Sequence, residues 1–343
     1  MSKHDLEIGE YKGDMLDGVP NGTGELFYKE NDPMDRCSYI GGWKGGRQNG
    51  NGIIKFNSGD IYTGEFEDGV PNGAGTFTYN NGDKEEVIMA NGVRHGRSKF
   101  SSAEDETVEE IMFWEGEARG PSKLLYPDGS FEERVYADGE KNGEARLVGA
   151  QGDVFKFVYK KNILNGPSQY TWASGRYETV DYVDGMREGP GLEVGVDGER
   201  EERMWVNGEL TGPAVLTGKT GDKLEFNYIK GIRSGPATYT FADGSIEISI
   251  YENGEQTGPA KLIWPNGATR EGVKVNGKWN GDCIYTFTEG PRAGKRDLEK
   301  WQNGELLSTQ KYYGKEQTSV ENWEDLKKLD EITQSCDNFM HQL

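Results

Sequence analysis

Paired glycines separated by three residues recur along nearly the whole chain and restrict its folding more than any other feature. Early copies read Gly18-Val-Pro-Asn-Gly22 and Gly69-Val-Pro-Asn-Gly73. The second glycine of the pair occurs twelve times, and nine of the eleven intervals between copies are 23 residues long. In one copy Asn162 replaces the first glycine, and asparagine is the other residue that best tolerates a positive φ angle. This period predicts a repeat architecture with a left-handed backbone at the glycine positions.

Each repeat is predicted to be a β-hairpin. Two short strand-like runs flank the Gly-x-x-x-Gly turn, as in residues 248–267. A second glycine turn follows at the opposite end, and its glycine recurs every 23 residues from Gly129 to Gly290. The residue before this glycine is usually polar, as in Asp128-Gly129, and such dipeptides favour tight hairpin turns. The sequence therefore predicts an all-β chain in which strands and turns alternate.

Side chains of the same kind return at fixed places in these hairpins. Two residues after the second glycine the side chain is always small, so Cys283 is predicted to fill a small slot. On the first strand, an aromatic residue usually stands three places before the first glycine, and from the fourth copy on the residue four places earlier is usually acidic. Residues an even number of places apart share one face of a strand, so an aromatic row is predicted beside an acidic row.

The two rows form the predicted partner-binding surface. Aromatic rings bury a large area at low entropic cost, and carboxylates select a basic partner and speed its encounter. The alternative is that the rings only pack between neighbouring hairpins and that the carboxylates are solvated. The predicted partner-binding residues are Tyr136, Tyr159, Tyr182, Trp205, Tyr228, Tyr251, Glu132, Glu178, Glu201 and Glu247.

The clearest copy resembles a known repeat. Tyr62-Thr-Gly-Glu-Phe-Glu-Asp-Gly-Val-Pro-Asn-Gly-Ala-Gly75 resembles the MORN repeat (membrane occupation and recognition nexus), and residues 11–24 and 39–52 are similar to it. The resemblance covers roughly residues 9–306. It implies an elongated, twisted, single-layer antiparallel sheet of about twelve hairpins. It also implies scaffold or partner-binding roles, in some cases with phosphoinositide binding.

From the fourth copy on, the leading Tyr-x-Gly of the repeat is mostly lost. These units are similar to the degenerate repeats that precede the lysine methyltransferase domain of the SET7 type. A SET domain would follow the repeats, and only about 40 residues follow them here. The resemblance therefore implies repeats of this kind without the SET domain.

The end of the chain changes from the hairpin period to a helical one. Thr318-Ser-Val-Glu321 has the form of a capping box. We predict an N-terminal tail at residues 1–8, the repeat sheet at 9–315 and an amphipathic helix at 316–343 that covers the open sheet edge. A dimerisation or partner helix is the alternative, which leaves a homodimer open. The apolar residues of this helix are Trp323, Leu326, Leu329, Ile332, Cys336 and Phe339.

Charge and composition limit the partners. The chain has 39 basic and 59 acidic residues and a net charge of −20, which argues against nucleic acid and anionic membranes as default partners. Its start is polar, no apolar run approaches the length of a membrane span, and three scattered cysteines indicate reduced thiols. We therefore expect a cytoplasmic protein.

The sequence contains no constellation that indicates catalysis. The three histidines are far apart, no Cys or His spacing fits zinc, and the many glycines are explained by turns rather than by a phosphate-binding loop. We therefore expect no enzyme activity, no metal and no cofactor.

The functional hypothesis is a non-enzymatic MORN-repeat scaffold or adaptor. It would bind a protein partner with a basic segment along the aromatic and acidic rows. One alternative is membrane association through phosphoinositides, for which the repeats offer mainly Lys160, Lys161 and the basic loop at residues 290–296. Another is a targeting subunit of a larger assembly, of a methyltransferase-like or cytoskeletal kind.

Overall fold

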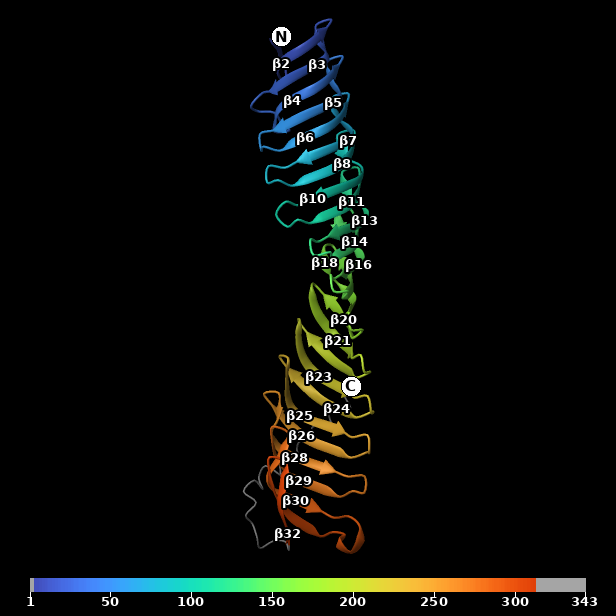
Figure 1. Cartoon of the computed structure of the whole chain (residues 1–343), viewed down its shortest axis with the longest axis vertical. Coiled ribbons are helices and arrows are strands. Elements are labelled where there is room, and N and C mark those ends of the chain that lie inside the picture. The colour runs from blue at the N-terminus through green and yellow to red at the C-terminus, as the bar shows by residue number, and fades with distance from the viewer. Residues whose placement is uncertain (1–2, 313–343) are drawn as a thin grey trace. The chain divides into compact units, whose positions relative to one another are not determined.

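The fold is built almost entirely from antiparallel strands. The computed structural model describes residues 3–312, and within that range it contains 32 strands and a single 3-10 turn, η1 (Gly290–Arg292). The chain divides into two compact units, Met1–Gly166 and Pro167–Leu343. Within each unit, strands that follow one another along the chain lie side by side in one layer (Figure 1). The prediction of an all-β antiparallel sheet is confirmed.

The first unit begins with β1, which pairs with β2 and therefore brings part of the predicted N-terminal tail into the sheet. Its strands are β1 (Lys3–Leu6), β2 (Gly9–Leu16), β3 (Val19–Tyr28), β4 (Arg36–Lys44), β5 (Arg47–Phe56), β6 (Ile61–Glu67), β7 (Val70–Thr78), β8 (Lys84–Ala90), β9 (Val93–Arg94), β10 (Gly96–Ser101), β11 (Val108–Trp114), β12 (Glu117–Ala118), β13 (Gly120–Leu125), β14 (Phe131–Ala137), β15 (Glu140–Lys141), β16 (Gly143–Val148), β17 (Val154–Lys160) and β18 (Ile163–Leu164).

The second unit continues the same alternation of strand and turn. Its strands are β19 (Gly166–Thr171), β20 (Tyr177–Val183), β21 (Met186–Val194), β22 (Arg200–Val206), β23 (Glu209–Thr217), β24 (Lys223–Ile229), β25 (Ile232–Thr240), β26 (Ile246–Glu252), β27 (Glu255–Gln256), β28 (Gly258–Ile263), β29 (Thr269–Val275), β30 (Lys278–Thr286), β31 (Arg296–Gln302) and β32 (Glu305–Tyr312). The helix predicted at residues 316–343 lies outside the described residues and stays a prediction.

The two glycines of each pair have different structural roles, so the prediction that they bound one five-residue turn is wrong. In the hairpin of β20 and β21, Asp184 and Gly185 have φ angles of 48° and 83°, and two successive positive angles are what a type I′ turn requires. Four residues later Gly189 has a φ of 82°, where the register between the strands shifts. The second glycine therefore forms a bulge rather than the end of the turn. Asn162 has a φ of 67°, which confirms the left-handed position.

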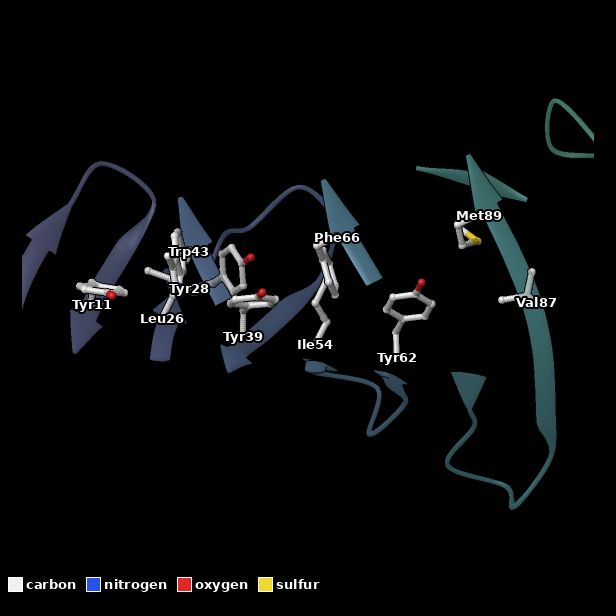
Figure 2. Packing of buried hydrophobic residues seen from close by; sticks show 10 residues of the cluster. All are labelled: Tyr11, Leu26, Tyr28, Tyr39, Trp43, Ile54, Tyr62, Phe66, Val87 and Met89. Carbon is white, nitrogen blue, oxygen red and sulfur yellow. The ribbon is translucent and has the colours of Figure 1, made fainter. Parts of the chain in front are cut away.

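The core of the first unit is a ladder of aromatic rings on one sheet face (Figure 2). Tyr11 is fully buried and lies over two glycines, because a Cβ atom added to Gly24 would come 2.5 Å from its ring carbons. Its ring contacts Trp43 of the next hairpin edge to face, with 5.1 Å between ring centroids. Tyr39 makes the same contact with Phe66 at 5.0 Å. Each hairpin thus covers the ring of the one before it.

Where Tyr-x-Gly is lost after the third repeat, a bulky residue at the glycine position fills the space that the tyrosine ring occupies in the early copies. Where Glu85 takes the tyrosine position, the following glycine position holds Val87, which is buried. The same position holds Val180 and Phe226 in the second unit, both buried. A glycine is required only under a flat ring, so a bulky residue fills the space when the ring is absent. Cys283 shows the converse, since its sulfur occupies the space above Gly272.

Gly189→Val should destabilise the protein by about 1–3 kcal/mol, because a β-branched residue is strained at this positive φ. The cost comes from the backbone alone, as no atom lies within 4 Å of a Cβ added there. Gly218→Ala is the control, since Gly218 has no positive φ and its nearest neighbour would be 3.7 Å away. Urea unfolding followed by circular dichroism measures both. Equal midpoints for the two variants would show that the bulge is misassigned.

Cys283 should be inert towards thiol reagents in the folded protein. It is fully buried, and burial raises the pKa of its thiol to about 12. Cys37 is exposed and serves as the internal control. In a Cys336→Ser background, Ellman's reagent should modify Cys37 quickly and Cys283 only at the rate of unfolding. Modification of Cys37 and Cys283 at the same rate would contradict the burial of Cys283 at the small-residue position.

Candidate partner-binding face

Within each unit, the predicted partner-binding residues share one face of the strands, which we call the aromatic–acidic face of that unit. In β20, Glu178, Val180 and Tyr182 alternate with residues of the opposite face, and Tyr182 stands across from Arg187 of β21. In the first unit, Glu132 and Tyr136 occupy the same places in β14. The register of each hairpin therefore brings the aromatic row and the acidic row together as the sequence predicts.

The two rows differ in how far solvent reaches them. Tyr136, Tyr159, Tyr182, Trp205, Tyr228 and Tyr251 are all half-buried, so each ring keeps an accessible part. The carboxylates are deeper: Glu132, Glu178 and Glu247 are only 7%, 4% and 6% exposed, and Glu201 is half-buried. The acidic row is therefore not the solvated row that one alternative assumed.

Arginines from the same face neutralise the acidic row in the first unit. Arg134, two residues after Glu132, is 6% exposed and lies between two carboxylates. Its Nη2 is 2.8 Å from Glu109 Oε1, and its Nη1 donates to Glu132 Oε2 at 3.3 Å. The buried Glu132 and the half-buried Glu109 pair with one buried guanidinium, which satisfies the rule that buried charges are paired.

Arg203 has the same role in the second unit. Its Nη2 is 2.8 Å from Glu178 Oε1 and 2.6 Å from Glu193 Oε2. Its Nη1 is 3.7 Å from Glu201 Oε1, so one guanidinium serves three carboxylates. The sequence analysis missed Arg134 and Arg203, because the position between the acidic and the aromatic residue holds no constant residue type.

Donors of the aromatic row also reach the acidic row of the preceding hairpin. Hydroxyl groups of Tyr159 and Tyr228 donate to Glu132 and Glu201, at 3.2 Å and 2.9 Å, and each donor follows its acceptor by 27 residues. Tyr136 bonds to Glu109 in the same way. Lys274, an exception in the aromatic row, places its Nζ 2.6 Å from Glu247, again 27 residues away. This spacing is a signal that sequence reasoning did not use.

One copy carries a basic residue in place of the acid. Arg270 stacks on the ring of Trp301, with its guanidinium carbon 4.5 Å from the ring centroid, and its Nε donates to Glu299 at 2.8 Å. In other copies these two positions hold a carboxylate and a tyrosine hydroxyl. In this copy they hold the cation of Arg270 and the aromatic ring of Trp301. The contact between neighbouring hairpins is kept although its chemistry changes.

The same contacts keep the tyrosines of the aromatic row protonated. Burial raises the pKa of Tyr159 to about 12, and both the negative charge of Glu132 and the hydrogen bond to it act in the same direction. Burial and a neighbouring carboxylate raise the pKa of Tyr136 as well. Burial opposes the ionisation of Glu85, but hydrogen bonds from Arg94, Tyr79 and Ser98 outweigh it and lower its pKa. The phenols Tyr136 and Tyr159 therefore stay protonated at neutral pH and act as hydrogen-bond donors.

The described part of the chain has neither a cluster of metal-ligating side chains nor a helix that could span a membrane. Residues 3–312 contain no group of three or more His, Cys, Asp or Glu side chains that could hold a metal ion. No helix in this range is long and apolar enough to cross a membrane. In the basic loop, Arg292 donates to Asp297 at 2.8 Å and stacks 4.1 Å from the centroid of Phe287. These contacts hold its guanidinium against Asp297 and Phe287.

Comparison with known proteins identifies the repeat. The family model of the MORN repeat matches seven segments, residues 11–32, 39–61, 62–84, 181–200, 204–223, 227–246 and 249–269. A search of curated proteins found no match. None of the matched segments falls between residues 84 and 181.

Two solved structures show a weak similarity to the chain. The SAS-4 (dCPAP) TCP domain of Drosophila melanogaster, solved in complex with a proline-rich motif of Ana2 (dSTIL), is 18% identical, covers 45% of this chain and 83% of its own, and has a TM-score of 0.30. The E1021V mutant of the TCP10 domain of Danio rerio CPAP is 14% identical, covers 76% of this chain and 99% of its own, and has a TM-score of 0.20. TM-scores this low support no conclusion about the function of this chain.

Tyr159→Phe should lower the free energy of unfolding at neutral pH by about 1 kcal/mol, because the hydroxyl bond to buried Glu132 is lost. The pKa of Tyr159 lies near 12 in the folded protein and near 10 when unfolded. The neutral phenol therefore stabilises the fold fully below about pH 10, and this contribution falls as the pH rises through about 12. The difference in free energy of unfolding between wild type and variant should therefore shrink between about pH 10 and pH 12.

Tyr177→Phe is the matched control for this prediction. Tyr177 lies on the opposite face, and its hydroxyl has no hydrogen bond to another described residue. Urea unfolding at neutral and at alkaline pH measures both variants. A Tyr159→Phe effect that equals the control, or that does not depend on pH, would contradict the bond to Glu132.

Proposed function

The chain is a MORN-repeat protein, and we propose that it is a non-enzymatic scaffold that binds a partner protein along the aromatic–acidic face. The observation that carries the proposal is the row of half-buried rings Tyr182, Trp205, Tyr228 and Tyr251. They return every 23 residues, which in an antiparallel sheet is two strands or about 10 Å. A regular row of partly accessible rings suits an extended partner segment that makes one contact per hairpin.

The rings are already ordered, which favours binding. Arg187 stacks 4.5 Å from the centroid of Trp205, and its Nε donates to the hydroxyl of Tyr182 at 3.3 Å. Side chains held in this way lose little conformational entropy when a partner covers them. Large, rigid rings of this kind are the residues that most often dominate binding energy at interfaces.

We further propose that the partner segment is basic. The support is the net charge of −20, whose field attracts cations and speeds their encounter. The carboxylates of the aromatic–acidic face already have internal donors, as with Glu178 and Arg203. The charge therefore contributes through long-range attraction, while the rings make the contact. The three scattered cysteines support a cytoplasmic location, which cell fractionation tests.

Tyr182→Ala combined with Trp205→Ala should weaken binding of the partner on the order of tenfold or more, since two ring contacts are lost. The partner is first captured from native lysate by the full chain and identified by mass spectrometry. Its affinity is then measured by titration calorimetry at several salt concentrations, and it should fall as salt rises. Tyr177→Ala, on the opposite face, is the control.

Thermal unfolding of each variant separates lost contacts from lost folding. A folded double variant that binds the captured partner as tightly as wild type would exclude the aromatic–acidic face as the binding surface. Affinity that does not change with salt would exclude the basic segment.

A further inference from the structure

Several exposed carboxylates of the second unit gather on the face opposite the aromatic–acidic face and in the adjoining hairpin turns. Side chains alternate along each strand, so Asp181 and Val183 of β20 are on this opposite face. Several exposed carboxylates on this face or in its hairpin turns form no ion pair with another residue of the described range 3–312. They are Asp181, Glu202, Glu209, Glu252 and Glu255. The buried acids, by contrast, are compensated within the protein.

Exposed apolar side chains gather beside these carboxylates, at the ends of three successive hairpins. Two of the hairpins contribute cross-strand apolar pairs, and the hairpin between them pairs Val206 with Glu209. We call these residues the turn stripe, and each is between 41% and 58% exposed. Its members are Val183, Met186, Val206, Ile229 and Ile232.

The turn stripe is continuous and has a defined end. Its members before the turn, Val183, Val206 and Ile229, are 23 residues apart, so each step crosses two strands. Its members after the turn, Met186 and Ile232, belong to the outer two hairpins, and Glu209 takes the place between them. A Cβ added to Gly208 would lie 3.9 Å from Met186 Cβ, so the turn of one hairpin rests against the apolar residue of the one before. In the next hairpin the equivalent pair is Glu252 and Glu255, which closes the stripe with negative charge. A contiguous apolar patch rimmed by carboxylates is a typical interaction site.

We infer that the turn stripe binds an amphipathic, basic α-helix of a partner protein. Two antiparallel strands advance about 9.6 Å, and seven residues of a helix rise about 10.5 Å, so a heptad repeat of apolar residues matches the stripe hairpin by hairpin. Lysine or arginine beside the apolar seam would meet Asp181, Glu209, Glu252 and Glu255. One lysine, Lys230, lies among these turns, so the charge of the surface stays negative.

A helix fits this surface better than a strand does. Both strands of each hairpin are paired with neighbours within the unit, so the turn stripe offers no free sheet edge. An extended segment laid over apolar side chains would leave its own N–H and C=O groups without partners, whereas a helix satisfies them internally. The inference is independent of the function proposed above, because it concerns the opposite face of the sheet.

The test uses the full chain and a synthetic peptide of about three heptads, with leucine on one face and lysine on the others. Its control is a peptide of the same composition in scrambled order. Fluorescence anisotropy should show the heptad peptide binding on the order of tenfold more tightly than the scrambled one. Equal binding of the two peptides would mean that charge alone attracts them and would overturn the inference.

Substitutions then locate the surface. Val206→Lys combined with Ile229→Lys should weaken peptide binding about tenfold or more. Val196→Lys is the matched control, because Val196 is an equally apolar residue, 69% exposed, in a loop away from the stripe. Tyr182→Ala with Trp205→Ala should leave peptide binding unchanged. Val206, Ile229 and Val196 are all exposed. Circular dichroism checks that each variant folds.

Peptide affinity that survives Val206→Lys with Ile229→Lys would also overturn the proposal. If the wild type also binds neutral phosphatidylcholine vesicles and this variant does not, the stripe is a lipid contact instead. Glu252→Gln with Glu255→Gln should reduce both the affinity and its dependence on salt, and an unchanged salt dependence would likewise count against a basic helix.

Discussion

Within residues 3–312, each unit of this protein is a single layer of strands, so no second layer of this range covers either of its faces (Figure 1). An apolar side chain can be buried only by its neighbours on the same face, chiefly those one hairpin away. Tyr11 is covered by Trp43 in this way, and the acid Glu132 receives the hydroxyl of Tyr159. Stability must therefore come from contacts between hairpins, because an isolated hairpin is marginal in water.

This constraint explains why the aromatic–acidic face mixes rings, carboxylates and arginines. A half-open face cannot be made wholly apolar without inviting aggregation, and buried carboxylates need donors. Arg203 and the tyrosine hydroxyls provide them, so the acids of this face contribute to cohesion between hairpins. On the opposite face of the second unit, several carboxylates, such as Glu252 and Glu255, are exposed and form no ion pair within the described range. The acids of the aromatic–acidic face are thus compensated, while part of the charge of the opposite face is free.

Features that depend on one residue's own backbone or size could be predicted from the sequence. The left-handed positions, the small slot of Cys283 and the sharing of one face by the two rows follow from period and parity. The bulge at Gly189 could not be separated from the turn, because both need a positive φ. The pairing of Glu178 with Arg203 was missed because it depends on which side chains meet across hairpins. The 27-residue spacing of donor and acid is the sequence signal for it.

Carboxyl footprinting tests this division of charge most directly. The folded protein is treated with a carbodiimide and an amine, and the modification rate of each carboxylate is read by mass spectrometry. Asp181, Glu209, Glu252 and Glu255 should react much faster than Glu85, Glu132, Glu178 and Glu247, and the difference should vanish in urea. Equal rates in the folded protein would contradict the account, since they would mean that the acidic row is solvated.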